Sequence, residues 1–286
     1  MNLCISIKIR KGKDVNKYIV QETRLLKNLD NEVIEILKKY DCYCCGGAVV
    51  SVFNHMPIND YDIYSVDQDN PSKIVDELEK IGFELKVTSH NAYSLLRKSK
   101  KGENKKKIKI QIIKYENFCN KDIKKTFGYF DFNCCMGGYS FKNKKFYFDK
   151  YFLTDNIEKR LRFNPGTEYP ICSLYRTIKY QKRGYILPGI EIIKIALAIN
   201  NLKMETYVDL KKQLMGIDTV FLKPLTDKLL NENNEKYDFS KFKDELSNFY
   251  NDYYNKIIAN TFEGNEEETD VDLEELEDSD LWSNCR

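Results

Sequence analysis

The sequence predicts an α+β protein with a mixed-sheet head, residues 1–150, followed by a helical domain, residues 151–262, and an acidic tail, residues 263–286. Two patterns support this division. Strand-like alternation of polar and apolar residues recurs up to about Tyr151, and apolar residues then repeat at spacings of three and four, as on amphipathic helices. The tail has few apolar residues to bury, which favours disorder.

The expected elements of the head follow from local patterns. A strand is expected over residues 3–10, and helices over 15–26 and 31–40. A short apolar strand, CYCC, ends at Gly46 and Gly47, and a helix, AVVSVFNHM, starts directly after them and stops at Pro57. The next strand is DYDIYSV, followed by a helix that opens at Pro71. Further strands are expected over 83–89, 91–98, 107–115, 130–141 and 144–150, with a Lys-dense hairpin tip at 100–107 and a short helix over 119–127.

Five helices are expected beyond the head, over residues 155–162, 171–183, 191–200, 205–215 and 239–260. Within the tail, LEELEDSDLW can form a docking helix for a protein partner, with Leu273, Leu276 and Trp282 as anchors.

The chemically informative stretch joins a glycine turn to a pair of carboxylates. Glycine lets the backbone approach a ligand closely, and a helix that starts at Gly46-Gly47 offers free N–H groups to phosphate. Asp60 and Asp62 lie at i and i+2 of the following strand, so their side chains share one face. A divalent cation relieves the repulsion between two such carboxylates, and Mg²⁺ prefers hard oxygen ligands. A phosphate cradle beside a metal-binding pair indicates nucleotidyl transfer.

This stretch resembles the motif of polymerase-β-like nucleotidyltransferases, in particular the poly(A) polymerase and tRNA nucleotidyltransferase head. That family has Gly-Gly-x-x-[RV]-[DS] followed by Asp-x-Asp, and here Val50 and Ser51 stand where many members have Arg and Asp. FDFNCCMGGY is similar to the family's Arg-Asp-Phe-Thr segment, with Asp131 on its Asp, and LYRTIKYQKRGY is similar to its Arg-rich helix. The closest likeness is to poorly characterised versions from phages and large DNA viruses. The resemblance to the family as a whole covers residues 41–190.

The resemblance implies a Mg²⁺- or Mn²⁺-dependent transfer of a nucleoside monophosphate from an NTP, ATP above all, to a hydroxyl group. It implies that Asp60 and Asp62 hold the metal, that Gly46, Gly47 and Ser51 contact the nucleotide, and that Asp131 assists catalysis or contacts the ribose. Two departures are visible. Gln111 stands where many members carry a third carboxylate, and no Glu-Asp-x-x-Arg segment is present, so CCA addition is not expected.

Basic groups on the helix at 171–183 are the second candidate feature. Arg176, Lys179, Tyr180 and Arg183 recur at spacings of three and four and therefore share a face. That face can bind a triphosphate or an RNA backbone, with Tyr180 stacking on a base, or it can be a solvated surface. Ile171, Leu174 and Ile178 lie on the opposite face, which is expected to enter the core. Arg160 and Arg162 are weaker candidates for the same role.

Charge and composition limit the class of partner. Residues 260–286 contain 11 acidic residues and one base, so the remainder carries a net charge of +12. A basic body suits a polyanion such as RNA, and a diffusely charged Lys-rich surface explains it equally well. No apolar run is long enough for a membrane span, and nine cysteines without a secretory signal favour reduced thiols in a host cytoplasm or a virion. His55, His90 and the apolar cysteines are expected to be structural rather than catalytic or zinc-binding.

Three classes of function remain open at this stage. The leading one is transfer to an RNA 3′ end. The second is a catalytically weak or inactive head that acts as a binding or assembly module, which Gln111 and the acidic tail favour. The third is nucleotidylation of a protein or a small molecule.

Overall fold

The computed structural model describes residues 17–89, 91–97, 107–119 and 122–214, together with a few residues between 238 and 248. The expected strand at 3–10, His90, nearly all of the Lys-dense hairpin tip, most of the helix at 239–260 and the acidic tail lie outside the described residues.

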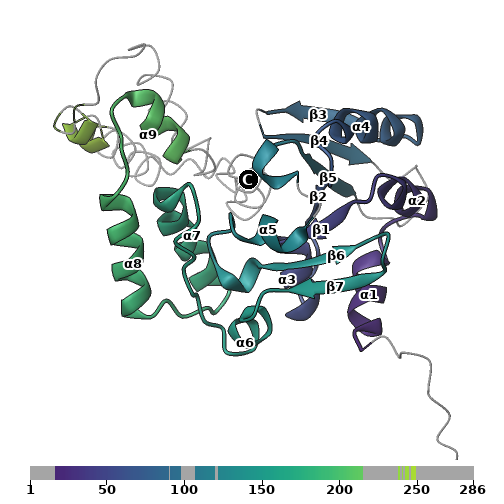
Figure 1. Ribbon diagram of the computed structural model, residues 1–286, viewed down its shortest axis with the longest axis horizontal. Coiled ribbons are helices and arrows are strands. Elements are labelled where there is room, and N and C mark those ends of the chain that lie inside the picture. Colours follow the sequence, from purple (N-terminus) through teal and green to yellow (C-terminus); the bar gives the residue numbers. More distant parts are fainter. Residues whose placement is uncertain are drawn as a thin grey trace, which may run out of the picture.

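Seven strands form one mixed sheet in the order β3-β4-β5-β2-β1-β6-β7 (Figure 1). Only β2 and β5 pair in parallel; the other neighbours are antiparallel. The strands are β1 (Tyr43–Cys45), β2 (Asp60–Tyr64), β3 (Glu84–Thr88), β4 (Ala92–Arg97), β5 (Ile108–Ile113), β6 (Gly137–Ser140) and β7 (Lys145–Phe148). The predicted α+β class with a mixed sheet is confirmed.

The helices follow the predicted order with shifted ends. They are α1 (Ile19–Leu26), α2 (Asn31–Lys39), α3 (Gly47–Phe53), α4 (Asn70–Lys80), α5 (Ile123–Phe127), α6 (Phe152–Ile157), α7 (Pro170–Lys182), α8 (Gly189–Asn200) and α9 (Tyr207–Leu214), with short 3-10 turns η1 (Glu116–Phe118) and η2 (Asn133–Cys135). The expected strand at 130–141 is half wrong, because its first part forms η2 and only β6 joins the sheet. The expected helix at 155–162 begins earlier and ends at Ile157.

The two faces of the sheet are covered by different helices. One core contains Val33, Leu37, Val49 and Leu78 of α2, α3 and α4, packed on Tyr61, Ile63, Ile110 and Ile112 of the sheet. The other contains Tyr43, Tyr64 and Ile113 of the sheet with Phe127, Phe132, Tyr180 and Ile195. Alternate residues of β2 and β5 thus point to opposite cores, as a pleated strand requires.

The second core runs without a break from the sheet into α7 and α8. Tyr180 and Ile195 are fully buried in it although both follow residue 150. In Figure 1, α7, α8 and α9 lie on the left of the molecule and the sheet with α2 and α4 on the right. The boundary predicted at residue 150 stays a prediction.

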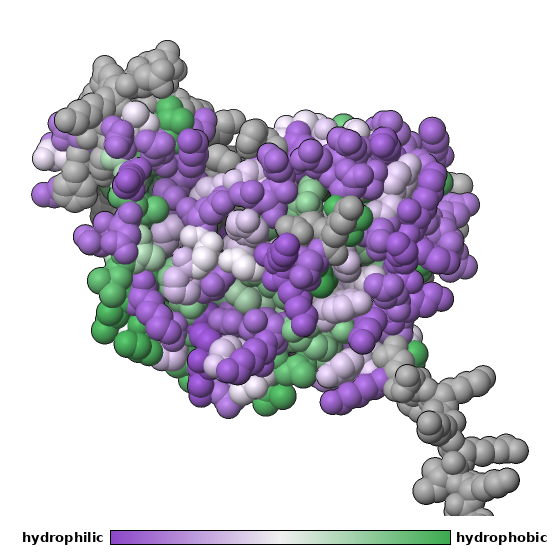
Figure 2. Space-filling model, viewed as in Figure 1, coloured by the Kyte–Doolittle hydropathy of each residue, from purple (hydrophilic) through white to green (hydrophobic). Residues whose placement is uncertain are grey.

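The surface is largely hydrophilic, with an apolar area at the lower left, where α8 lies (Figure 2). Ile190, Ile193 and Leu197 of α8 are each more than half exposed. No helix in the described part of the chain is long and apolar enough to cross a membrane.

Candidate active site

The turn between β1 and α3 has the conformation that the double glycine predicts. Gly46 has φ 71° and ψ −128°, a conformation that residues with a side chain rarely adopt. Its N–H donates to the carbonyl of Gly137 on β6 (3.1 Å), and its carbonyl accepts from Val50 N–H (3.0 Å), closing the first turn of α3. The predicted order of strand, glycine turn, helix and strand is confirmed.

Asp60 and Asp62 lie on one face of β2, at its start. Because β2 runs antiparallel to β1, this start is next to the end of β1 and hence to the glycine turn. Asp62 is fully buried and Asp60 is 8% exposed. The intervening Tyr61 points to the other face, where its hydroxyl donates to the carbonyl of Leu25 (3.0 Å). The structure therefore brings the two carboxylates and the glycine turn together.

Gln111 and Lys109 of β5 stand directly beside this pair. In the parallel register, Asp62 is opposite Gln111 and Asp60 is opposite Lys109, so all four side chains start from the same face. Gln111 is fully buried, and within the described residues neither its amide nitrogen nor its amide oxygen has a hydrogen-bond partner. Oδ2 of Asp60 is likewise buried without a hydrogen-bond partner among the described residues. Buried polar atoms are rarely left in this state unless they serve a ligand or water.

These unsatisfied oxygens fit a divalent cation. Two carboxylates and the amide oxygen of Gln111 are hard donors of the kind that Mg²⁺ and Mn²⁺ take, whereas a thiophilic metal prefers sulfur or imidazole. No group of three or more His, Cys, Asp or Glu side chains that could hold a metal occurs in the described part. The carboxylate pair, with Gln111 beside it where a third carboxylate is expected, supplies the oxygen donors of this candidate site.

Asp131 and Arg176 form a buried ion pair. Nη1 of Arg176 donates to Oδ2 of Asp131 at 2.7 Å, and the two side chains are 9% and 4% exposed. Burial raises the pKa of the Tyr64 hydroxyl on β2, and the nearby positive charge of Arg176 opposes part of this rise. Arg176 therefore lies near the face of β2 that carries Asp62. Asp131 and Arg176 are expected from the sequence as separate site residues, and no sequence pattern predicts their pairing.

The orientation of α7 reverses one expectation. Leu174 and Ile178, expected in the core, are 42% and 51% exposed, while Arg176 and Tyr180 face inward. Tyr180 is 1% exposed, packs edge-on against Phe132 and contacts the Cys135 thiol through its hydroxyl. It is a core residue, so the expectation that it stacks on a base is wrong. The buried partners Asp131 and Phe132 turn this face of the helix toward the core that it shares with the sheet.

Other candidates fall into three places. Ser51 is buried on α3, and Lys179 and Arg183 are partly buried on α7. Arg162 forms two hydrogen bonds to the buried carboxylate of Asp155 (3.1 and 3.2 Å), and Arg160 pairs with Glu158 (2.6 Å), so both guanidinium groups are engaged within the fold. Burial raises the pKa of the Cys42 and Cys134 thiols, which disfavours the thiolate that a metal or a nucleophilic reaction requires.

Comparison with known proteins assigns the chain to a family. The profile of a family described as Gabija anti-defense 2 family protein matches residues 16–159, half of the chain, including the glycine turn, Asp60, Asp62 and Asp131. The chain belongs to this family. A protein called Gabija anti-defense 2, from Bacillus phage SPbetaL7, is 30% identical over 243 residues, which are 84% of this chain and 58% of that protein.

The solved structures that resemble this Gabija anti-defense 2 family chain share its fold. A CCA-adding enzyme in an apo form has a TM-score of 0.50 at 16% identity and covers 67% of this chain and 48% of its own. A Thermotoga maritima CCA-adding enzyme complexed with tRNA has a TM-score of 0.46 at 16% identity, covering 79% and 53%. The likeness to the first of these enzymes supports a nucleotidyltransferase fold of the predicted α+β kind. The chain spans about half the length of the relatives it matches.

Proposed function

We propose that this chain is a Mg²⁺-dependent nucleotidyltransferase that transfers a nucleoside monophosphate from an NTP to a hydroxyl group. The observation that carries the proposal is the placement of Asp60 and Asp62 on one face of β2 beside the Gly46-Gly47 turn. The unsatisfied oxygens of Asp60 and Gln111 support it, because a bound cation would satisfy them.

Each site residue has a proposed role. Asp60 and Asp62 hold the cation, and the backbone of Gly46 and Gly47 with Ser51 contacts the phosphates. Arg176, Lys179 and Arg183 of α7 bind the triphosphate. Asp131 acts through Arg176, because their ion pair fixes the guanidinium at the site. When bound, the cation supplies charge neutralisation at the triphosphate and lowers the pKa of the attacking hydroxyl.

The transfer itself exchanges one phosphoester linkage for another. The hydroxyl oxygen of the acceptor bonds to the α-phosphorus, and the bond from that phosphorus to the α,β-bridging oxygen breaks. Pyrophosphate leaves with the electron pair, and a carboxylate of the pair accepts the hydroxyl proton. The positive charges of Arg176, Lys179 and Arg183 stabilise the charge that develops on the leaving group.

The acceptor we propose is an RNA 3′ end, with ATP as the NTP. The basic body, the likeness of the fold to CCA-adding enzymes and the resemblance to poly(A) polymerases support this choice. The name of the phage relative supports a role against a host defence system. We further propose that the head ends near residue 150 and that the helices to residue 262 form a domain of their own before a tail that docks on a protein.

The test uses the full chain with each of the four NTPs labelled at the α-phosphate, Mg²⁺ or Mn²⁺, and bulk RNA. Label on RNA that is lost in the D60N/D62N variant supports the proposal. Label on the protein itself or on a small molecule assigns a different acceptor. Failure to bind any NTP with either metal overturns the proposal.

A second candidate function is a binding module without turnover. The neutral Gln111 at the third position favours it, as does the pairing of Asp131 with Arg176, which removes Asp131 as a ready third metal ligand. NTP binding without transfer to any acceptor would identify this alternative.

A further inference from the structure

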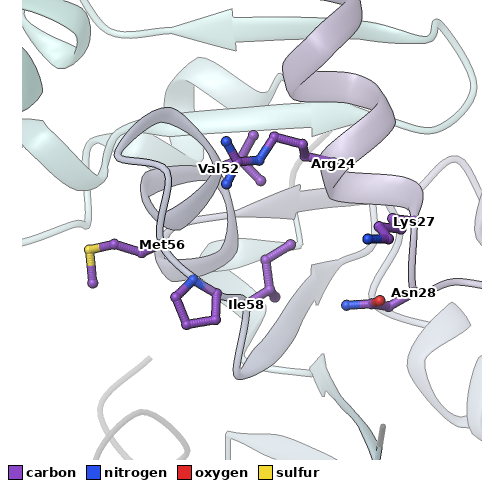
Figure 3. Close-up of a pocket in the computed structure, with 7 residues that line it drawn as sticks. Arg24, Lys27, Asn28, Val52, Met56 and Ile58 are labelled. Carbon is purple, nitrogen blue, oxygen red and sulfur yellow. The ribbon is translucent and has the colours of Figure 1, made fainter. Parts of the chain in front are cut away.

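A pocket of about 270 Å³ lies between the end of α1 with the turn after it and the end of α3 with the segment after it. Arg24 of α1 and Lys27 and Asn28 of the turn after it line one side, and Val52 of α3 with Met56, Pro57 and Ile58 lines the other (Figure 3). Lys27 and Asn28 follow Arg24 by three and four residues and lie just past the end of α1 at Leu26. In Figure 3 the ends of Lys27 and Asn28 point toward Ile58, while Arg24 lies over Val52.

The polar groups of this pocket are a guanidinium, an ammonium and an amide, and its lining holds no carboxylate. Within the described chain, neither Arg24 nor Lys27 has an ion-pair partner. The two neighbouring acids are engaged elsewhere. Glu22 accepts a hydrogen bond from the Tyr139 hydroxyl (2.5 Å), and Asp30 pairs with Arg97. The pocket therefore carries two positive charges that no neighbouring carboxylate neutralises.

His55 positions Arg24 without neutralising it. Nη1 of Arg24 lies 2.5 Å from Nδ1 of His55. A guanidinium has no acceptor atom, so Nδ1 is the acceptor in this contact. His55 adopts a left-handed backbone conformation, φ 60°, just after α3, which directs its ring to α1. A carboxylate at this place would have cancelled the charge; a neutral acceptor fixes the guanidinium and leaves its charge available.

The position of the pocket relates it to the carboxylate pair. Ile58 precedes Asp60 by two residues, a chain length of about 7 Å at most. The pocket lies on the α1 side of the sheet, since its lining residues Val52 and Ile58 pack in the core that contains Tyr61, whereas Asp60 and Asp62 point to the other side. It is therefore a separate site at the same end of β2.

We propose that this pocket binds a backbone phosphate of the acceptor nucleic acid, held by Arg24 and Lys27, with Val52 and Ile58 packing against the adjoining sugar or base. Two unneutralised cations above an apolar floor match a nucleotide unit of a single strand. The inference rests on the proposed function only for the identity of the acceptor. The phosphate site itself would stand without transfer activity.

The test measures binding of a labelled single-stranded RNA to the full chain at several salt concentrations. R24Q/K27Q should weaken binding and reduce the slope of log K against log salt by about 0.7, since each phosphate contact on a single strand contributes about 0.7 and the pocket holds one phosphate. K73Q/K80Q, which removes two exposed lysines of α4, has the same net charge and should leave the slope unchanged. A wild-type slope in R24Q/K27Q overturns the proposal.

A pair of isosteric variants isolates the charge of the positioning residue. H55N keeps a neutral acceptor and H55D introduces a carboxylate, and both residues tolerate a left-handed backbone. H55N should bind RNA as the wild type does, and H55D should bind it as weakly as R24Q. Equal binding by H55N and H55D overturns the proposal.

Two further arms separate the sources of phosphate and the two proposals. Unlabelled RNA, AMP and inorganic phosphate are each used to compete with the labelled RNA. Competition by RNA alone supports a nucleic-acid site. Equal competition by AMP assigns the pocket to free nucleotides and overturns the proposal that it binds the acceptor. D60N/D62N should keep RNA binding that depends on Arg24 and Lys27. If no variant transfers nucleotides but this dependence holds, the proposed function fails and the pocket stands.

Discussion

Replacing Asp131 with Asn tests whether this carboxylate positions Arg176 or acts independently. The substitution keeps the shape of the side chain and removes the charge that faces Nη1 of Arg176 at 2.7 Å. Since both side chains are almost fully buried, it leaves an uncompensated buried guanidinium, and the free energy of unfolding should fall by about 3 kcal/mol. With a urea m-value of about 3 kcal/mol/M, the unfolding midpoint should fall by about 1 M.

The double variant D131N/R176M should recover much of this loss, because replacing both members of a buried ion pair by groups of similar volume is often nearly neutral. Affinity for a non-hydrolysable NTP with Mn²⁺ gives the second measurement. D131N should weaken it about tenfold, equivalent to 1.4 kcal/mol. The double variant should bind no more weakly than R176M alone. If the losses in NTP affinity add instead, Asp131 contacts metal or nucleotide directly and the positioning role is refuted.

Four more outcomes are expected. D60N/D62N should lower transfer at least a hundredfold and remove the Mg²⁺-dependent rise in Tm. It should raise Tm in EDTA, because two buried carboxylates that repel each other are gone. An unchanged Mg²⁺ response in differential scanning fluorimetry would contradict the metal site. G138A should lower stability by about 1–3 kcal/mol, since its Cβ would lie 2.4 Å from Ile123 Cδ1 and 2.8 Å from Cys45 Sγ. In the control G189A, the new Cβ meets nothing within 4 Å. Equal Tm values for the two variants would refute the close packing at Gly138. Burial raises the pKa of the Cys119 thiol from 9.0 to about 11, so the thiol ionises in the unfolded chain first. Stability should therefore fall as the pH rises from 9 to about 11. The urea midpoint should fall more steeply with pH in the wild type than in C119A. Q111D should increase Mn²⁺ affinity, measured by EPR of free Mn²⁺, and lower stability in EDTA; no gain in affinity would show that position 111 is not a metal ligand.

The local features of the site could be predicted from the sequence, because each has a local cause. Two glycines between a strand and a helix fix the turn, as the φ of 71° at Gly46 shows, and an Asp-x-Asp on a strand fixes the common face of Asp60 and Asp62. The fold class followed from the change in hydrophobic period. Element ends were less accurate, since α6 and α1 end or begin several residues from their expected limits.

Features that depend on contacts between distant segments could not be predicted. The sequence does not give the register that sets Lys109 beside Asp60, although the repeat KIKIQ places Lys109 and Gln111 on one face. Periodicity showed that Arg176 and Tyr180 share a face of α7 but not which face would enter the core. Hydrophobicity favoured Leu174 and Ile178, and the buried pairing of Arg176 with Asp131 and the packing of Tyr180 on Phe132 decided otherwise.

The charge of the carboxylate site follows from that register. Asp60 and Asp62 contribute two negative charges, Gln111 none, and Lys109 one positive charge from a partly buried position in register with Asp60. A site with three carboxylates would carry three negative charges, so this one attracts divalent cations less strongly and repels the triphosphate less. Weaker cation binding leaves less positive charge to neutralise the triphosphate, and the Lys109 ammonium replaces part of it. A lysine cannot bridge an attacking hydroxyl and a carboxylate as a metal does. K109M should therefore weaken NTP binding in the absence of metal more than in its presence, while K114M, at the other end of β5 with its ammonium over the Tyr93 ring, should change neither. Equal losses with and without metal would contradict the idea that Lys109 and the metal share the neutralisation of the phosphates.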